Sequence, residues 1–369
     1  MFKKFLPWYL LALVVLSLAF IYGCGAAPTS GGGGGGTIAN RTGSYSYSGT
    51  QAPGDIWTWN ISDETFSGTC ETGINVGLYV TGEYTTLASK FCKAHIMSVY
   101  GVATSEYAYF LEFPDTMLLV QPPNAGDNKD NVIVCTAHST EAPAAGKYLI
   151  VTIPWQGWTT GNAAYGTVEA TLSGTWSFDV TNYLLTGETS DNFTVSGYTF
   201  ESGVMNNGNY DPSGGGDPKI FMTPTGVFMG DLGTSSGGFA GGSYEAVDTS
   251  DVVKHDFRGV RFKYFTGSGT NETEPVAASP DTSTSLNAHR YTDVDGNTLD
   301  LSDDTFVTLE ADPAGTGFIN LYAHDENVGT TALYRSVAAK VGPAPGKYML
   351  FGFGVEAGQP VNFLVIQVD

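Results

Sequence analysis

The stretch DIWTWNISDETFSGT, residues 55–69, alternates apolar and polar side chains before it reaches a turn. Trp57, Trp59 and Ile61 would share one face of an extended chain, and polar residues occupy the positions between them. A period of two residues is typical of a β-strand with one buried face. The polar residues that follow favour a turn, so this stretch predicts a β-hairpin.

Similar short segments recur at a spacing of roughly ten residues, which is typical of an antiparallel meander, barrel or sandwich. The expected strands in the first half are residues 56–61, 78–85, 91–100, 107–113, 117–121, 132–137 and 148–153. The chain also has 48 Gly, 20 Tyr and 21 Phe, a composition that favours strands and turns over helices. We therefore expect a mostly β fold.

The stretch at residues 55–69 is similar in sequence to a second stretch later in the chain. DGNTLDLSDDTFVTL, residues 295–309, agrees with residues 55–69 at six of fifteen positions. PAAGKY at 143–148 likewise recurs as PAPGKY at 343–348. We expect two related β-units in which Tyr148 and Tyr348 are equivalent; convergence of turn chemistry is the alternative.

This similarity suggests a division of the chain. The first β-unit would be residues 41–160 and the second would be residues 260–369, with a β-rich middle segment at 161–259. A short helix is expected near residues 248–257, after a run of Asp, Thr and Ser.

The first 24 residues resemble the export signal and lipobox of bacterial lipoproteins. Two lysines precede an apolar run over residues 5–22, which ends in Ile21-Tyr22-Gly23-Cys24. The resemblance implies removal of residues 1–23 as a signal peptide and attachment of lipid, such as palmitate, to Cys24. Gly25 implies sorting to the outer membrane. An uncleaved transmembrane anchor is the alternative, and it would export the rest of the chain as well.

Residues 24–40 are rich in glycine and predict a flexible tether. The whole chain carries a formal net charge of −21, which argues against nucleic acid as a partner. The expected partners are the membrane, through lipid on Cys24, and a glycan or another envelope protein.

Three cysteines remain if Cys24 is lipidated. Cys70, Cys92 and Cys135 would allow one disulfide and leave one thiol in an oxidising compartment. Their spacing does not decide which two would pair.

Carboxylates gather between residues 293 and 304. Asp293, Asp295 and Asp300 form a candidate calcium site, because calcium prefers several carboxylate and carbonyl oxygens. The alternative is turn chemistry, since Asp295 is followed by Gly296 and Asp-Gly is a hairpin signal. No other cofactor is predicted.

Two pairs of tryptophans could bind a ligand. Trp57 and Trp59 align with a leucine-containing face of residues 295–309, which favours a place in the core. Trp155 and Trp158 flank a Gln-Gly turn and are candidate ligand-binding residues, able to stack on sugar rings.

No catalytic residues are predicted. GTSSG at 233–237 matches a nucleophile-elbow pattern but precedes glycine-rich sequence that cannot form the required helix. The leading hypothesis is a non-enzymatic envelope protein for binding, adhesion or a surface coat. The second is a carrier of a small apolar or glycan ligand, in the manner of lipocalins; a hydrolase is third. An apolar pocket of several hundred cubic ångströms would favour the carrier.

Overall fold

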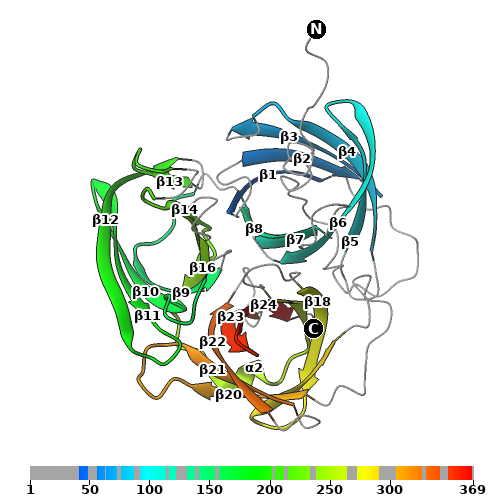
Figure 1. The fold of residues 1–369 in the computed structure, drawn as a ribbon. Helices are drawn as coiled ribbons and strands as arrows, with labels where there is room; N and C mark the ends of the chain where they lie inside the picture. Colours follow the sequence, from blue (N-terminus) through cyan, green and yellow to red (C-terminus); the bar gives the residue numbers. More distant parts are fainter. Residues whose placement is uncertain are drawn as a thin grey trace.

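The protein forms three closed antiparallel barrels, each of eight strands (Figure 1). The mostly β prediction is therefore confirmed. The fold is a computed structural model that describes residues 41–48, 56–62, 64–72, 76–86, 92–113, 116–121, 131–137, 141–153, 158–201, 204–211, 215–232, 238–263, 272–290, 305–325, 330–340 and 348–367. This part of the chain contains no helix long and apolar enough to cross a membrane.

The first barrel closes by pairing β1 with both β2 and β8. Its described interior follows the expected alternation: Val80, Gly82 and Tyr84 are buried, and Glu83 between them is exposed. The strands are β1 (Arg41–Ser48), β2 (Ile56–Ser62), β3 (Thr65–Thr72), β4 (Tyr79–Thr86), β5 (Cys92–Val99), β6 (Val102–Phe113), β7 (Thr116–Gln121) and β8 (Asn131–Ala137).

The second barrel closes by pairing β9 with both β10 and β16. The segment predicted at residues 161–259 thus lies mostly in a barrel that also includes β9, a strand within the range predicted for the first unit. The strands are β9 (Gly146–Ile153), β10 (Tyr165–Ser173), β11 (Thr175–Tyr183), β12 (Thr189–Glu201), β13 (Val204–Asn206), β14 (Lys219–Met222), β15 (Val227–Asp231) and β16 (Gly238–Ser243).

The third barrel follows a short helix, α2 (Thr249–Val252), within the range predicted for one. The Asp248 side chain caps it by accepting a hydrogen bond from the Ser250 N–H at 2.9 Å. The strands are β17 (Phe257–Lys263), β18 (Glu272–Pro280), β19 (Ser285–Arg290), β20 (Thr305–Ala311), β21 (Ile319–Asp325), β22 (Thr330–Lys340), β23 (Tyr348–Glu356) and β24 (Gln359–Gln367).

The second and third barrels share a hydrophobic core between their outer faces. β9 contacts β22 and β23, and side chains from both barrels belong to one buried cluster. In β9, Leu149 and Val151 join this shared cluster while Ile150 faces the interior of its own barrel. The Asn362 amide also donates a hydrogen bond to the Thr152 carbonyl across the boundary, at 3.0 Å. These strands are apolar on both faces because both faces are buried.

The predicted equivalence of Tyr148 and Tyr348 is wrong. Tyr148 lies in the first strand of the second barrel, and Tyr348 lies in the seventh strand of the third. Residues 65–69 likewise belong to a third strand, whereas residues 305–309 belong to a fourth. The similarity after the GKY marks has a simpler reason: β9 and β23 both bury two faces, and each therefore needs an apolar run.

A cross-strand pair of glycine and phenylalanine recurs in each barrel, where a Cβ on the glycine would overlap the ring. The hypothetical Cβ–ring distances are 2.3, 1.8 and 1.9 Å for Gly82, Gly230 and Gly352. Each ring therefore lies flat against its glycine, an arrangement known to support glycine in sheets. The pairs are Phe66 with Gly82, Phe239 with Gly230, and Phe363 with Gly352.

Candidate functional site

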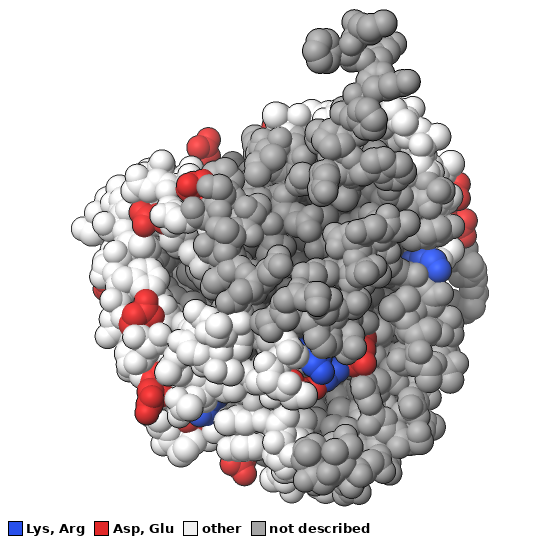
Figure 2. Space-filling model, in the orientation of Figure 1, with Lys and Arg blue, Asp and Glu red and all other residues white. Residues whose placement is uncertain are grey.

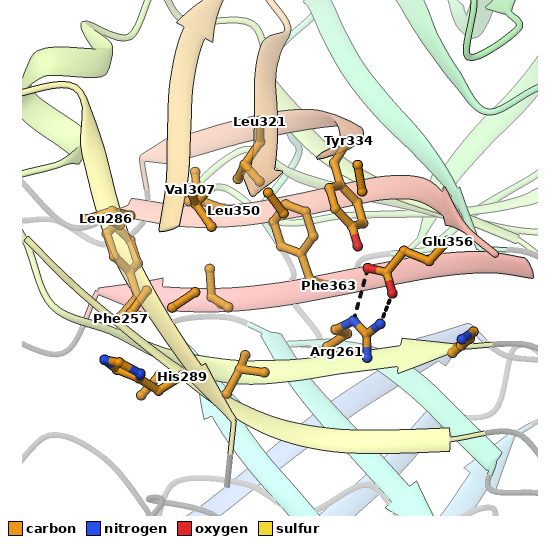
Figure 3. Close-up of a pocket in the computed structure, with 18 of the residues that line it drawn as sticks. Phe257, Arg261, Leu286, His289, Val307, Leu321, Tyr334, Leu350, Glu356 and Phe363 are labelled. Carbon is orange, nitrogen blue, oxygen red and sulfur yellow. Dashed lines mark hydrogen bonds and ion pairs between the residues drawn. The ribbon is translucent and has the colours of Figure 1, made fainter. Parts of the chain in front are cut away.

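The third barrel encloses an apolar cavity of about 550 Å³ (Figure 3). This volume is within the range of small-molecule sites in proteins. Most of its wall consists of inward-facing hydrocarbon side chains from successive strands. They include Phe257, Val276, Leu286, Val307, Leu321, Leu350, Phe363 and Val365.

The cavity exists because small residues occupy several inward positions. Ala278, Ala288, Ala323 and Ala332 line it from four different strands. An eight-stranded barrel has an interior that larger side chains can fill completely, so alanine at these positions leaves space for a small ligand.

Two aromatic rings form one wall. Tyr334 and Phe363 meet edge to face, with ring centroids 5.4 Å apart and an interplanar angle of 75°. Phe363 lies on Gly352, and Tyr334 lies on Gly354, whose hypothetical Cβ would be 2.5 Å from the ring. The two glycines let the rings lie against the barrel wall instead of across the cavity.

One end of the cavity is charged. Arg261 forms ion pairs with Glu274 and Glu356, and its guanidinium contacts both carboxylate oxygens of Glu356 (Figure 3). The three side chains are 19%, 26% and 24% exposed, so the cluster lies at the boundary between cavity and solvent. Lys263 also lines the cavity. Arg261, Lys263 and Glu356 line this end of the cavity and Glu274 pairs with Arg261 beside it, so this end offers both donors and acceptors of hydrogen bonds.

The opposite end is packed closed. Val252 and Val253, at the end of α2, join Phe257 and Tyr348 in the barrel core. The Tyr348 hydroxyl donates a hydrogen bond to Asp251, which lowers the pKa of that carboxyl. Burial, reinforced by this hydrogen bond, raises the pKa of Tyr348 to about 12.

Of the residues proposed from sequence, only Trp158 lies within the described structure. It is 2% exposed and packs on Phe353 in the core shared by the second and third barrels, with ring centroids 5.1 Å apart. It does not line the cavity of the third barrel. Trp155 and Cys24 lie outside the described residues.

The calcium candidates Asp293, Asp295 and Asp300 also lie outside the described residues, so calcium binding there stays a prediction. Within the described ranges, no group of three or more His, Cys, Asp or Glu side chains could hold a metal. Cys70 is buried inside the first barrel. The choice among the three possible cysteine pairings stays open.

The charged cluster was missed from sequence. Glu274 and Glu356 are 13 and 95 residues from Arg261, and only strand pairing brings them together. The available signal is the alternation in FRGVRFK, residues 257–263. Phe257, Arg261 and Lys263 share one face of β17, so two basic residues stand at positions that face the barrel interior.

No protein-family model matches the chain, and no curated protein matches it. Among solved structures, it is similar to a double mutant of the vaccine antigen transferrin-binding protein B from Haemophilus parasuis Hp5, with 7% identity and a TM-score of 0.26. That match covers 85% of this chain and 65% of the other. Isotype 1 transferrin-binding protein B from serogroup B Neisseria meningitidis gives 10% identity, a TM-score of 0.30, and coverage of 86% and 66%.

The chain thus spans about two thirds of the length of these proteins. The TM-scores are low, so these similarities do not indicate a function for this chain.

Proposed function

We propose that the third barrel binds one small, mostly apolar molecule, and that the chain presents this barrel at the bacterial envelope through lipid on Cys24. The observation that carries the proposal is the 550 Å³ cavity with its hydrocarbon wall. Transfer of apolar ligand surface from water into such a cavity is favourable, by roughly 25 cal/mol per Å². The proposal favours the carrier hypothesis over adhesion or a surface coat.

The ligand has an apolar body and a polar, uncharged end. Its body would contact the alanine and leucine side chains, and its polar end would reach the cluster around Arg261. Arg261 is already paired with Glu274 and Glu356, and Glu356 itself lines the cavity beside Arg261 and Lys263, so a fully charged ligand would meet like charge as well as opposite charge. A hydroxyl, ester or amide group can instead accept from the arginine or donate to a carboxylate.

The proposed role is binding without catalysis. The wall is mainly hydrocarbon, and Arg261 is engaged by two carboxylates. Such a lining is suited to retaining an apolar ligand. The membrane partner in this proposal is the lipid anchor, and a glycan or envelope-protein partner is a separate possibility outside the barrel.

The experiment is a fluorescence titration with the neutral apolar probe N-phenyl-1-naphthylamine. The mature chain is used with Cys24→Ser, which removes the lipid so that no detergent competes for the cavity. We expect saturable enhancement at one site, and weaker binding when Ala332→Leu takes up part of the cavity. Absence of saturable binding to the folded chain, or undiminished binding to Ala332→Leu, would refute the proposal.

A further inference from the structure

The second barrel contains a cavity of about 370 Å³ that the proposed function does not use. One end of this barrel is filled by Tyr148, Trp176 and Tyr198, which all belong to its interior core. The Tyr198 hydroxyl donates to the Pro218 carbonyl at 2.7 Å, and the Tyr148 hydroxyl donates to the Ala144 carbonyl. The open space is therefore confined to the other half of the barrel.

Phenylalanine rings surround this space. Phe178, Phe193, Phe228 and Phe239 all line the cavity. Phe228 stacks on Phe239, with centroids 5.7 Å apart, and meets the edge of Phe178 at 6.0 Å. Phe193 is 39% exposed although it is a large apolar side chain. Its ring is therefore accessible to a ligand at the entrance.

The polar groups at the entrance are acidic or neutral. Asp191 lines the cavity, together with Ser190, Asn162 and Asn182, and no lysine or arginine lines it. Residues 146–243 contain eight Asp and Glu but only two Lys and no Arg, a formal charge of −6. On the face shown in Figure 2, scattered acidic side chains outnumber basic ones among the residues that are drawn in colour or white.

Both lysines of this barrel are held away from the cavity. The Lys147 ammonium lies 4.6 Å from the centroid of the Tyr244 ring, and the Lys219 ammonium lies 5.6 Å from that of Tyr210. Neither lysine is part of the cavity lining. An anionic ligand would therefore find a carboxylate at the entrance and no basic side chain to balance its charge.

We propose that the second barrel binds a small organic cation, such as a substituted ammonium, with its charge between the phenylalanine rings and Asp191. The negative face of an aromatic ring attracts a cation, most strongly where water is excluded. The carboxylate adds a direct countercharge, and the acidic surface favours the approach of cations. A neutral ligand gains nothing from either charge effect. This site does not depend on ligand binding in the third barrel.

The test uses three probes of similar size: benzyltrimethylammonium, benzyl alcohol and benzoate. Calorimetric titration of the mature Cys24→Ser chain, with the third barrel saturated by N-phenyl-1-naphthylamine, should rank the cation above the alcohol and the alcohol above benzoate. Asp191→Asn should weaken cation binding about five-fold, in keeping with a partly exposed ion pair, and leave the alcohol unchanged. Phe193→Leu should weaken cation binding about three-fold.

The matched control is Glu169→Gln, which removes the same charge from an exposed position of β10 outside the cavity lining. It should change cation affinity less than two-fold. Equal affinity for cation and alcohol, no binding of the cation, or equal effects of Glu169→Gln and Asp191→Asn would overturn the proposal. Asp191→Asn should still bind N-phenyl-1-naphthylamine normally, so failure of this site is distinguishable from failure of the third-barrel function.

Discussion

Substitution of Ala332 by leucine tests whether the third barrel contains usable space. Ala332 lines the cavity from β22. Leucine adds three carbons, and burial of each is worth about 0.8 kcal/mol, so filling the cavity should stabilise the unliganded protein by about 2 kcal/mol. Ala338 is the matched control, because it lies on the same strand, is 6% exposed and belongs to the packed core. Leucine there should destabilise the fold by about 1–3 kcal/mol through overpacking.

The assay is urea unfolding of the mature Cys24→Ser chain, with and without N-phenyl-1-naphthylamine. A probe at 100 times its dissociation constant should stabilise the parent chain by about 2.7 kcal/mol through preferential binding to the folded state. It should add less to Ala332→Leu, whose longer side chain takes up part of the space for the probe. If Ala332→Leu and Ala338→Leu destabilise the chain equally, the cavity is too constrained to accept a ligand and the reasoning fails.

Three further predictions concern other parts of the molecule. Gly352→Ala should destabilise the chain by at least about 1 kcal/mol in urea unfolding, because the added Cβ would lie 1.9 Å from the Phe363 ring; Gly161→Ala, whose Cβ would meet only one atom at 3.9 Å, should cost less. Burial raises the pKa of Tyr148 to about 12, so the folded state retains a proton that the unfolded state loses near pH 10. Stability should therefore fall as the pH rises from 10 to 12, by about 2–3 kcal/mol for this residue, and Tyr148→Phe should reduce that fall in a pH series of urea midpoints. Cys24→Ser should abolish metabolic labelling by a fatty acid, and labelled Cys24→Ser protein would contradict the lipoprotein assignment.

The sequence predicted the β class because alternation and turn residues are local properties. It did not predict that the strands close into three barrels, because closure depends on pairings between strands that are distant in the chain, such as β9 with β16. The apparent repeat was misleading for a physical reason. Tyr148 and Tyr348 each begin an apolar run in a strand with two buried faces. Because both strands need apolar residues on both faces, their sequences are similar although the strands hold different positions in their barrels.

The cavity could not be predicted from the sequence. Ala278, Ala288 and Ala323 resemble any other strand alanines until the register places them on one interior. The candidate Trp158 illustrates the converse, since an aromatic near a loop was expected to meet ligand but is 2% exposed between two barrels. Packing between barrels is a tertiary property, and no local pattern distinguishes it from a binding surface.

The most direct test of the central claim is a methyl NMR titration of the chain, labelled at alanine methyl groups, with N-phenyl-1-naphthylamine. Ala288, Ala323 and Ala332 line the cavity, whereas Ala338 lies in the packed core of the same barrel. We predict that the three cavity methyl resonances shift together and saturate at one equivalent of probe, while the Ala338 resonance stays in place. Saturable binding that leaves the three cavity methyl resonances unmoved would show that the probe binds elsewhere and would contradict the account.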